Sequence, residues 1–131
     1  MALNNISTAA RNAMCDAFVD QFEVGTADAS GDIQIYDAGF ATLLAELTFS
    51  NPAFGNAVAG VATANAIASD ASADNSGTAA VCRFRDRDNG TVVEGTVGTT
   101  GSGADIELNT VTIATLDIVA ISSGTITQPA G

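Results

Sequence analysis

The chain has 131 residues and carries a formal net charge of −11, from 15 acidic and 4 basic side chains. So few cations cannot neutralise many phosphates, and the acidity therefore argues against binding nucleic acid and against attraction to anionic membrane surfaces. The same charge favours solubility at high copy number. With an apolar fraction of 47%, a chain of this length is expected to form one domain, residues 1–131, around a single core.

The sequence also lacks the side chains that most enzymes use. It contains no His, no Lys and no Trp, and only one Tyr. A Ser–His or Cys–His nucleophile therefore cannot be assembled, and a Schiff-base lysine or a Walker lysine is excluded. A carboxylate pair for glycoside hydrolysis remains formally available, but glycosidases usually bind sugars on aromatic side chains, which are scarce here. We therefore predict a non-enzymatic protein that needs no cofactor.

The first segment has the pattern of an amphipathic helix over residues 6–22. Its apolar stripe has three- and four-residue spacing and consists of Ile6, Ala9, Ala10, Ala13, Met14, Ala17, Phe18 and Phe22. Asn5 or Ser7 can cap the start of the helix, and Gly25 ends the segment. The polar residues off this stripe are expected to face water, and they are Arg11, Asn12, Asp16 and Asp20.

An apolar stripe of this width is too large to leave in water. We expect the helix to pack it either on the rest of the domain or on a neighbouring copy of the chain. Met14 and Phe18, two large members of the stripe, are therefore candidate interface residues.

After Gly25 the hydrophobic period changes to two, which is typical of strands. Ile33 and Ile35 alternate with Gln34 and Tyr36 in a first short strand. In the next segment, one predicted face carries Leu43, Ala45, Leu47 and Phe49. The opposite face carries Leu44, Glu46 and Thr48. Asn51-Pro52 then interrupts the pattern.

The remaining segments also favour strands. Residues 57–67 are rich in Ala, Val and Thr and lean toward a strand, and residues 70–77 form a polar connection. The clearest hairpin joins residues 80–85 to 91–97 through a turn at Asp88, Asn89 and Gly90. Further strands are marked by Ile106 and Leu108, Val111 and Ile113, Leu116, Ile118 and Ala120, and Ile126.

This spacing predicts a mainly β fold. We expect an antiparallel β-sandwich of about seven or eight strands over residues 32–128, behind one N-terminal α-helix. Jelly-roll and immunoglobulin-like topologies both remain open.

Cys15 and Cys82 have no CxxC spacing, and no His is present to complete a zinc site. We predict that both are small buried apolar side chains, and a disulfide between them remains open.

Two acidic loops place oxygen atoms at alternate positions, as calcium loops do. Asp70 and Asp74 lie in residues 70–77, and Asp86 and Asp88 lie in residues 86–90. Neither loop has the Gly and the closing Glu of an EF-hand. Asp, Asn and Ser also favour turns through their own hydrogen bonds, so we predict turns and no bound metal.

Arg83, Arg85 and Arg87 concentrate three of the four cations in one place. Alternation places Arg83 and Arg85 on one strand face, with Arg87 near the hairpin tip. They either pair internally with carboxylates such as Glu94, or form a contact patch for an acidic partner or another copy of the chain.

No apolar stretch reaches the ~20 residues that a membrane-spanning helix needs. The N-terminus also lacks the basic start and apolar run of a secretory signal. We therefore expect synthesis in a cytoplasm and no membrane partner.

Residues 43–55, LLAELTFSNPAFG, resemble the LATLTLSDPAFG block of small structural proteins of tailed bacteriophages. The similarity continues through residues 60–67, 69–74, 95–99 and 103–110, and residues 12–17 are similar too. It therefore spans nearly the whole chain. Its motifs are structural turns and strands.

The resemblance implies a component of the virion, made in the cytoplasm of the host bacterium. One expected role is a capsid decoration, or cement, protein that stabilises the head through contacts with the major capsid protein and with other copies of itself, as a closed oligomer such as a trimer. The alternative is a tail or fibre module that binds a glycan or receptor on the host surface.

Overall fold

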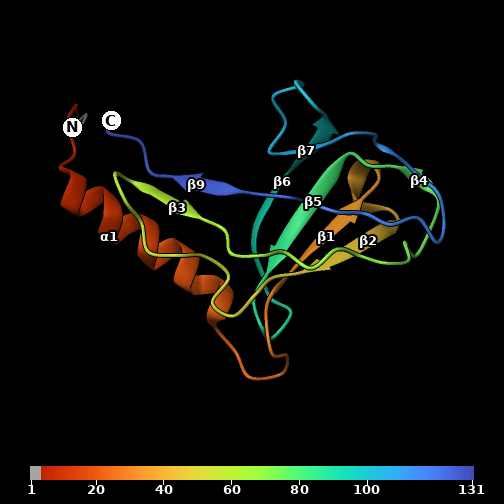
Figure 1. Ribbon diagram of the computed structural model, residues 1–131, viewed down its shortest axis with the longest axis horizontal. Helices are drawn as coiled ribbons and strands as arrows, with labels where there is room; N and C mark the ends of the chain where they lie inside the picture. The colour runs from red at the N-terminus through yellow and green to blue at the C-terminus, as the bar shows by residue number, and fades with distance from the viewer. Residues whose placement is uncertain (1–3) are drawn as a thin grey trace.

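The computed structural model describes residues 4–131, in which one N-terminal α-helix precedes a curled sheet of five strands (Figure 1). The helical elements are α1 (Thr8–Val19) and the 3₁₀ turns η1 (Asp20–Glu23) and η2 (Ala38–Phe40). The strands are β1 (Asp32–Tyr36), β2 (Leu43–Thr48), β3 (Val61–Thr63), β4 (Gly77–Thr78), β5 (Val81–Arg85), β6 (Thr91–Thr99), β7 (Ile106–Leu108), β8 (Thr112–Ile113) and β9 (Thr125–Thr127). The predicted mainly β class with one N-terminal helix is confirmed.

The strands form one large sheet and two short pairs. The large sheet has the order β2-β1-β5-β6-β7, while β3 pairs with β9 and β4 with β8. All pairs are antiparallel except β6 and β7, which are parallel. The predicted β-sandwich is not confirmed, and the expectation of purely antiparallel pairing is wrong at β7.

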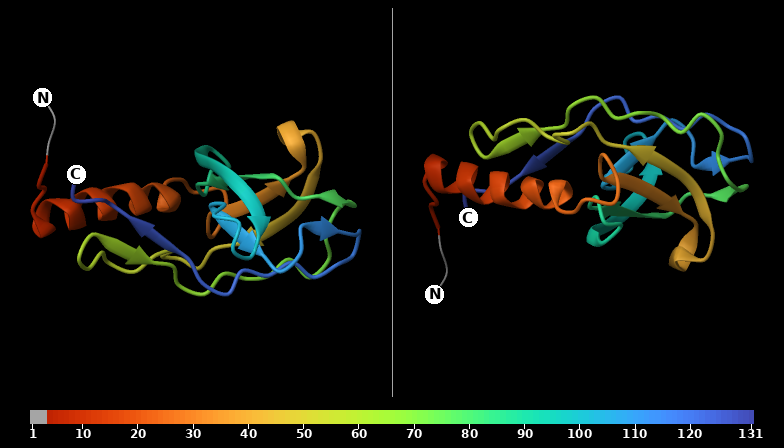
Figure 2. Two further views of the ribbon diagram at one scale, coloured as in Figure 1. Left: turned by 90° about the horizontal axis from the view of Figure 1, so that it is seen from above. Right: turned by 90° about the horizontal axis from the view of Figure 1, so that it is seen from below.

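The molecule is elongated, with α1, β3 and β9 at one end and most of the five-stranded sheet, together with β4, at the other (Figures 1 and 2). The two ends of the described chain meet beside α1, where the backbone N–H of Ile6 donates to the carbonyl of Ala130 at 2.8 Å. Within residues 4–131, no helix combines the length and the apolar character that a bilayer-spanning segment requires.

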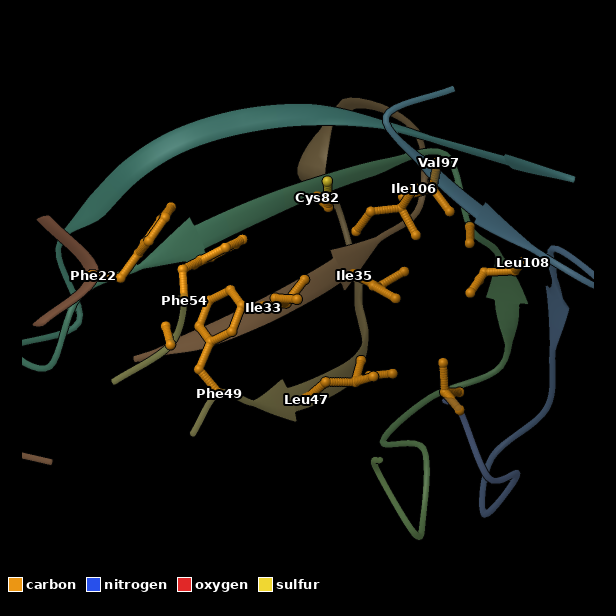
Figure 3. Close-up of a cluster of buried hydrophobic side chains, with 14 of the residues drawn as sticks. Phe22, Ile33, Ile35, Leu47, Phe49, Phe54, Cys82, Val97, Ile106 and Leu108 are labelled. Atoms are coloured by element: carbon orange, nitrogen blue, oxygen red, sulfur yellow. The ribbon is translucent and has the colours of Figure 1, made fainter. Parts of the chain in front are cut away.

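The core lies in the concave side of the curled sheet. Ile33, Ile35 and Leu47 point into this interior from β1 and β2 (Figure 3). At the end nearest α1, the interior is aromatic. The ring of Phe22 is fully buried, and its centroid lies 5.4 Å from that of Phe49 and 5.6 Å from that of Phe54. This aromatic cluster joins the helix to the sheet.

Strand β2 departs from the predicted alternation at one residue. Ile35 is opposite Ala45, but Tyr36 is opposite Leu43, so Leu44 is an extra residue in a β-bulge. Leu44 was expected on the polar face, yet it is fully buried and packs close to Gly77. The bulge therefore adds Leu44 to the core without moving Ala45 from its predicted face.

The helix begins at Thr8, two residues later than predicted, and its buried face is different. The hydroxyl of Ser7 accepts a hydrogen bond from the N–H of Ala10 at 3.2 Å and caps α1. Most of the predicted apolar stripe is nevertheless exposed, namely Ala9, Ala10, Ala13, Met14 and Ala17. Within the chain, α1 instead buries Cys15 and Val19.

Three polar residues that were expected to face water contact the segment 57–60. The Asn12 side chain accepts from the N–H of Gly60 at 2.7 Å, and the Asp16 carboxylate accepts from the N–H of Ala57 at 2.6 Å. Arg11 donates to the carbonyl of Ala59 at 3.3 Å. The expectation for these residues is wrong because this segment has free backbone groups that the helix side chains satisfy.

The expected strand through Leu116, Ile118 and Ala120 is also absent. Leu116 lies in a turn with φ of 76°, and Leu116 and Ile118 are 72% and 73% exposed. Only Val119 forms an isolated bridge, with Asp70.

Candidate interaction surfaces

Arg85 is held inside a network of carboxylates on the outer face of the sheet. It lies opposite Asp32 in the β1–β5 register, and its Nε and Nη2 atoms donate to the two carboxylate oxygens of Asp32 at 2.7 and 2.6 Å. A further contact joins Nη2 to Glu46 at 3.2 Å. The side chains of Arg85 and Asp32 are only 16% and 11% exposed. This bidentate geometry keeps the pKa of Arg85 raised, chiefly through its hydrogen bonds to Asp32.

Arg83 and Arg87 also have partners within the chain. The guanidinium of Arg83 lies 4.2 Å from the ring centroid of Phe40 and 5.3 Å from that of Tyr36, and its Nε lies 3.5 Å from a carboxylate oxygen of Glu94. Such a cation over aromatic rings gains roughly 0.5–1 kcal/mol at an exposed site. Arg87 donates from Nε to the carbonyl of Asp28 at 2.8 Å.

The three arginines therefore do not form one free cationic patch. Arg83 and Arg85 share a strand face, as predicted, and their geometry matches the internal-pairing alternative. A role of the arginines at an interface stays a prediction. It now concerns Arg83 and Arg87, because Arg85 is paired with Asp32 and Glu46 within the chain.

Met14 and Phe18 lie in different environments, although both belong to the predicted stripe. Met14 is 40% exposed, so it is available to a neighbouring molecule. Phe18 is half-buried, and its ring meets that of Phe22 edge to face at a centroid distance of 5.7 Å.

The acidic loops use their carboxylates to hold the backbone. Asp70 accepts from the N–H groups of Glu46 and Ser72, and Asp86 accepts from those of Asp88 and Gly90. The contacts with Ser72, Asp88 and Gly90 are the turn-forming role that the sequence predicted, whereas the contact with Glu46 ties the first loop to β2. Within residues 4–131, no three acidic or cysteine side chains converge in a way that could hold a metal ion.

Cys15 and Cys82 are both buried, as predicted, and neither is in a disulfide. Cys15 donates from Sγ to the carbonyl of Ile126 at 3.3 Å. Burial raises the pKa of the Cys82 thiol to about 12, and the nearby charge of Asp105 adds to the effect. Both cysteines therefore act as core residues.

Sequence analysis missed the large apolar side chains that are most exposed within residues 4–131. Leu116 and Ile118 belong to the segment 114–118, which we call the distal loop, at the end of the molecule opposite α1 (Figure 1). Val58, which is 74% exposed, lies between Ala57 and Ala59, and side chains of α1 contact the backbone of both neighbours. Alternation suggested a strand at Leu116 and Ile118, and only Asp117 between them hinted at a turn.

Sequence analysis also missed a groove of about 740 Å³ between β6 and the segment 120–126. Half-buried apolar side chains from different elements line it, namely Phe18, Phe84, Val93, Ile121 and Ile126. Asp105 and Glu107 lie at its rim. Backbone hydrogen bonds from Thr96 to Asp105, and from the 101–103 turn to Glu107, keep the pKa of each carboxyl low, so both are charged at neutral pH.

No protein-family model matches this chain, and no curated protein or solved structure does so either. The resemblance to phage structural proteins therefore remains an expectation that depends on the residues quoted for it.

Proposed function

We propose that this chain is a non-enzymatic structural protein of a bacteriophage particle, and specifically a decoration protein that stabilises the head. The observation that carries the proposal is the distal loop, which holds Leu116 and Ile118 out in solvent at one end of an elongated molecule. Two large apolar side chains exposed to this extent, two residues apart in one loop, offer apolar surface for contact with another protein.

The distal loop is preorganised for such a contact. Its backbone is tied to Ala73 by two hydrogen bonds, from the N–H of Leu116 at 2.9 Å and to the carbonyl of Asp117 at 2.8 Å. The carboxylate of Asp117 accepts from the N–H of Ala114 at 2.8 Å and closes the turn. A fixed loop loses little conformational entropy on binding, so more of the burial energy appears as affinity.

The magnitudes favour binding in many copies. Burying two aliphatic side chains yields roughly 3–6 kcal/mol, which is little after the entropy of association is subtracted. A closed oligomer, such as a trimer, would engage several loops at once and gain from multivalency. The charge of −11 per copy is screened beyond about 8 Å, so short-range apolar contacts can hold the copies together. We propose the major capsid protein as the partner of the distal loop.

Locating the protein in imaged phage particles tests this role directly. A decoration protein is present in hundreds of copies on the head, and heads that lack it lose integrity on heating or in low salt before complete heads do. A few copies at the tail tip would instead support the tail or fibre module. Heads without the protein that are as stable as complete ones would also contradict the decoration role.

Substitutions in the distal loop test the surface. We expect Leu116→Asn with Ile118→Ser to reduce binding to heads by about tenfold or more, equivalent to about 1.4 kcal/mol, because apolar burial is lost. Asn tolerates the positive φ at position 116, so the melting temperature of the isolated protein should stay unchanged.

The matched control is Val24→Ser, which removes another exposed apolar side chain that is outside the distal loop. It should bind heads as the wild type does. Equal losses in both variants would show that the distal loop has no special role.

A further inference from the structure

The second edge of β6 is only partly paired. Along this edge β7 pairs with Val97, Gly98 and Thr99 alone. In the described part of the chain, no strand lies beside the first half of β6 on the side away from β5. An unpaired edge presents backbone donors and acceptors to any extended chain that can reach it.

Hydrogen bonding near the end of β6 shows which residues face this open edge. Val97 donates to the carbonyl of Ala80, on the β5 side, whereas Thr96 donates to the carboxylate of Asp105 on the opposite side. The direction of the backbone N–H and carbonyl groups alternates along a strand. Those of Glu94 therefore point to the same side as those of Thr96, away from β5. The N–H and carbonyl of Glu94 are therefore free to pair with an added strand.

The open edge borders the groove described above. Val93, Glu94 and Gly95 form one wall, and the segment 120–126 forms the other. Between them, half-buried rings such as Phe18 and Phe84 line the groove. The groove therefore combines an unpaired backbone edge of β6 with a lining of apolar side chains.

We propose that this groove binds an extended segment of a partner protein, which adds to the free edge of β6 as a further strand. Its apolar side chains, at alternate positions, occupy the groove. Lysine or arginine residues flank this apolar run and lie near the acidic rim. The inference does not depend on where in a particle the chain resides.

Charge complementarity identifies the flanking residues of the partner. Asp105 and Glu107 remain ionised at the rim, and none of the four arginines lines the groove. A second copy of this chain is a poor occupant, because it has no lysine, carries a net charge of −11, and has its arginines engaged with its own side chains and backbone. The occupant is therefore a different protein with a basic and apolar segment.

A synthetic probe tests the proposal: acetyl-Lys-Lys-Val-Thr-Val-Thr-Val-Thr-Val-Lys-Lys-amide, titrated against the full chain by calorimetry. We expect saturable binding that weakens with added salt, and slower hydrogen exchange of the Glu94 amide in the complex. A probe in which Glu replaces each Lys should bind at least about tenfold more weakly. So should a probe in which Pro replaces the central Thr and the Val that follows it, because one of these two N–H groups faces β6.

A pair of variants at one position isolates the backbone edge. Glu94→Pro removes an N–H that points away from β5, so the β5–β6 ladder is retained while strand addition is blocked. Glu94→Thr removes the same carboxylate but keeps the N–H. We expect the first variant to bind the probe about tenfold more weakly than the second, with both melting cooperatively.

Three results would overturn the inference: equal affinity of the two Glu94 variants, equal affinity for the Pro-containing probe, or no saturation by the Lys-flanked probe at millimolar concentration. Competition by a small apolar compound such as a fatty alcohol, with no effect of the Glu94→Pro variant on the probe, would identify the groove as a small-molecule site instead.

Discussion

At the residue scale, the ion pair between Asp32 and Arg85 is sensitive to substitution. Both partners are largely buried, and removing one leaves the other charge without its counter-ion. We expect Arg85→Met to lower the free energy of unfolding in urea by about 2–4 kcal/mol, somewhat less than the loss of a fully buried pair.

Arg87→Ser is the matched control, because Arg87 makes one hydrogen bond to a backbone carbonyl near the surface. Its effect should be about 1 kcal/mol or less. An Arg85→Met variant as stable as Arg87→Ser would mean that Asp32 finds compensation in water. An experiment that replaces Arg83, Arg85 and Arg87 together would therefore not distinguish loss of folding from loss of binding to a partner.

The carboxylates that cap backbone amides set the acid stability. Hydrogen bonds from the N–H groups of Thr26 and Ala27 lower the pKa of Asp88, and Asp105 and Glu107 are lowered in the same way. A group with a lowered native pKa stabilises the fold above its ordinary pKa, and this contribution is lost as the pH falls through the native value.

The melting temperature should therefore be nearly constant from pH 7 to about 5, where no His titrates, and should fall below about pH 4. Asp88→Asn keeps an acceptor oxygen but cannot ionise, so its melting temperature should fall less steeply in acid. An unchanged acid slope in this variant would exclude Asp88 as a contributor.

The two thiols give a further prediction at this scale. Burial of Cys15 and Cys82, with the raised pKa of Cys82, should prevent reaction with a thiol reagent at pH 8 in the folded protein. In denaturant both should react at once. A rapidly reacting thiol in the native protein would place one of them nearer the surface than the structure does.

At the element scale, α1 separates two substitutions that the sequence pattern treats as equivalent. Phe18→Asp would place a charge beside the Phe22 ring and should lower the free energy of unfolding by about 3 kcal/mol or more. Met14→Asp lies on the exposed face and should change it by about 0.5 kcal/mol or less.

Urea titration of the isolated protein compares the two variants. If Met14→Asp nevertheless weakens association with particles or between copies, the exposed face of α1 is an interface, as the sequence analysis expected. Equal destabilisation of both variants would instead mean that Met14 is buried in the isolated protein.

Period-two patterns predicted the central strands well, because alternate apolar side chains of β1 and β5, such as Ile33, Ile35 and Cys82, are buried in the core. The face of α1 could not be predicted in this way, since it depends on the distant segment 57–60. Asn12 and Asp16 are drawn inward by the amides of Gly60 and Ala57, which periodicity does not represent. The bulge at Leu44 is likewise set by its pairing with β1.

At the scale of the whole molecule, the sequence predicted the class but neither the sheet architecture nor the surfaces. The parallel pairing of β7 follows a short return of the chain after β6, and no residue pattern distinguishes it from a hairpin. The groove arises where β6 and the segment 120–126 come together, so no single stretch of sequence encodes it. The arginines were predicted as a group, but their partners come from several other segments of the chain.

The hydrogen bond between Ile6 and Ala130 places both ends of the described chain at the same pole, opposite the distal loop. A peptide or protein fused before residue 4 or after residue 131 would emerge there, far from Leu116 and Ile118. Such a fusion would leave the distal loop free to bind a surface. If the chain coats a phage head through that loop, fusions at either terminus should be displayed outward, which would make it a two-ended display scaffold.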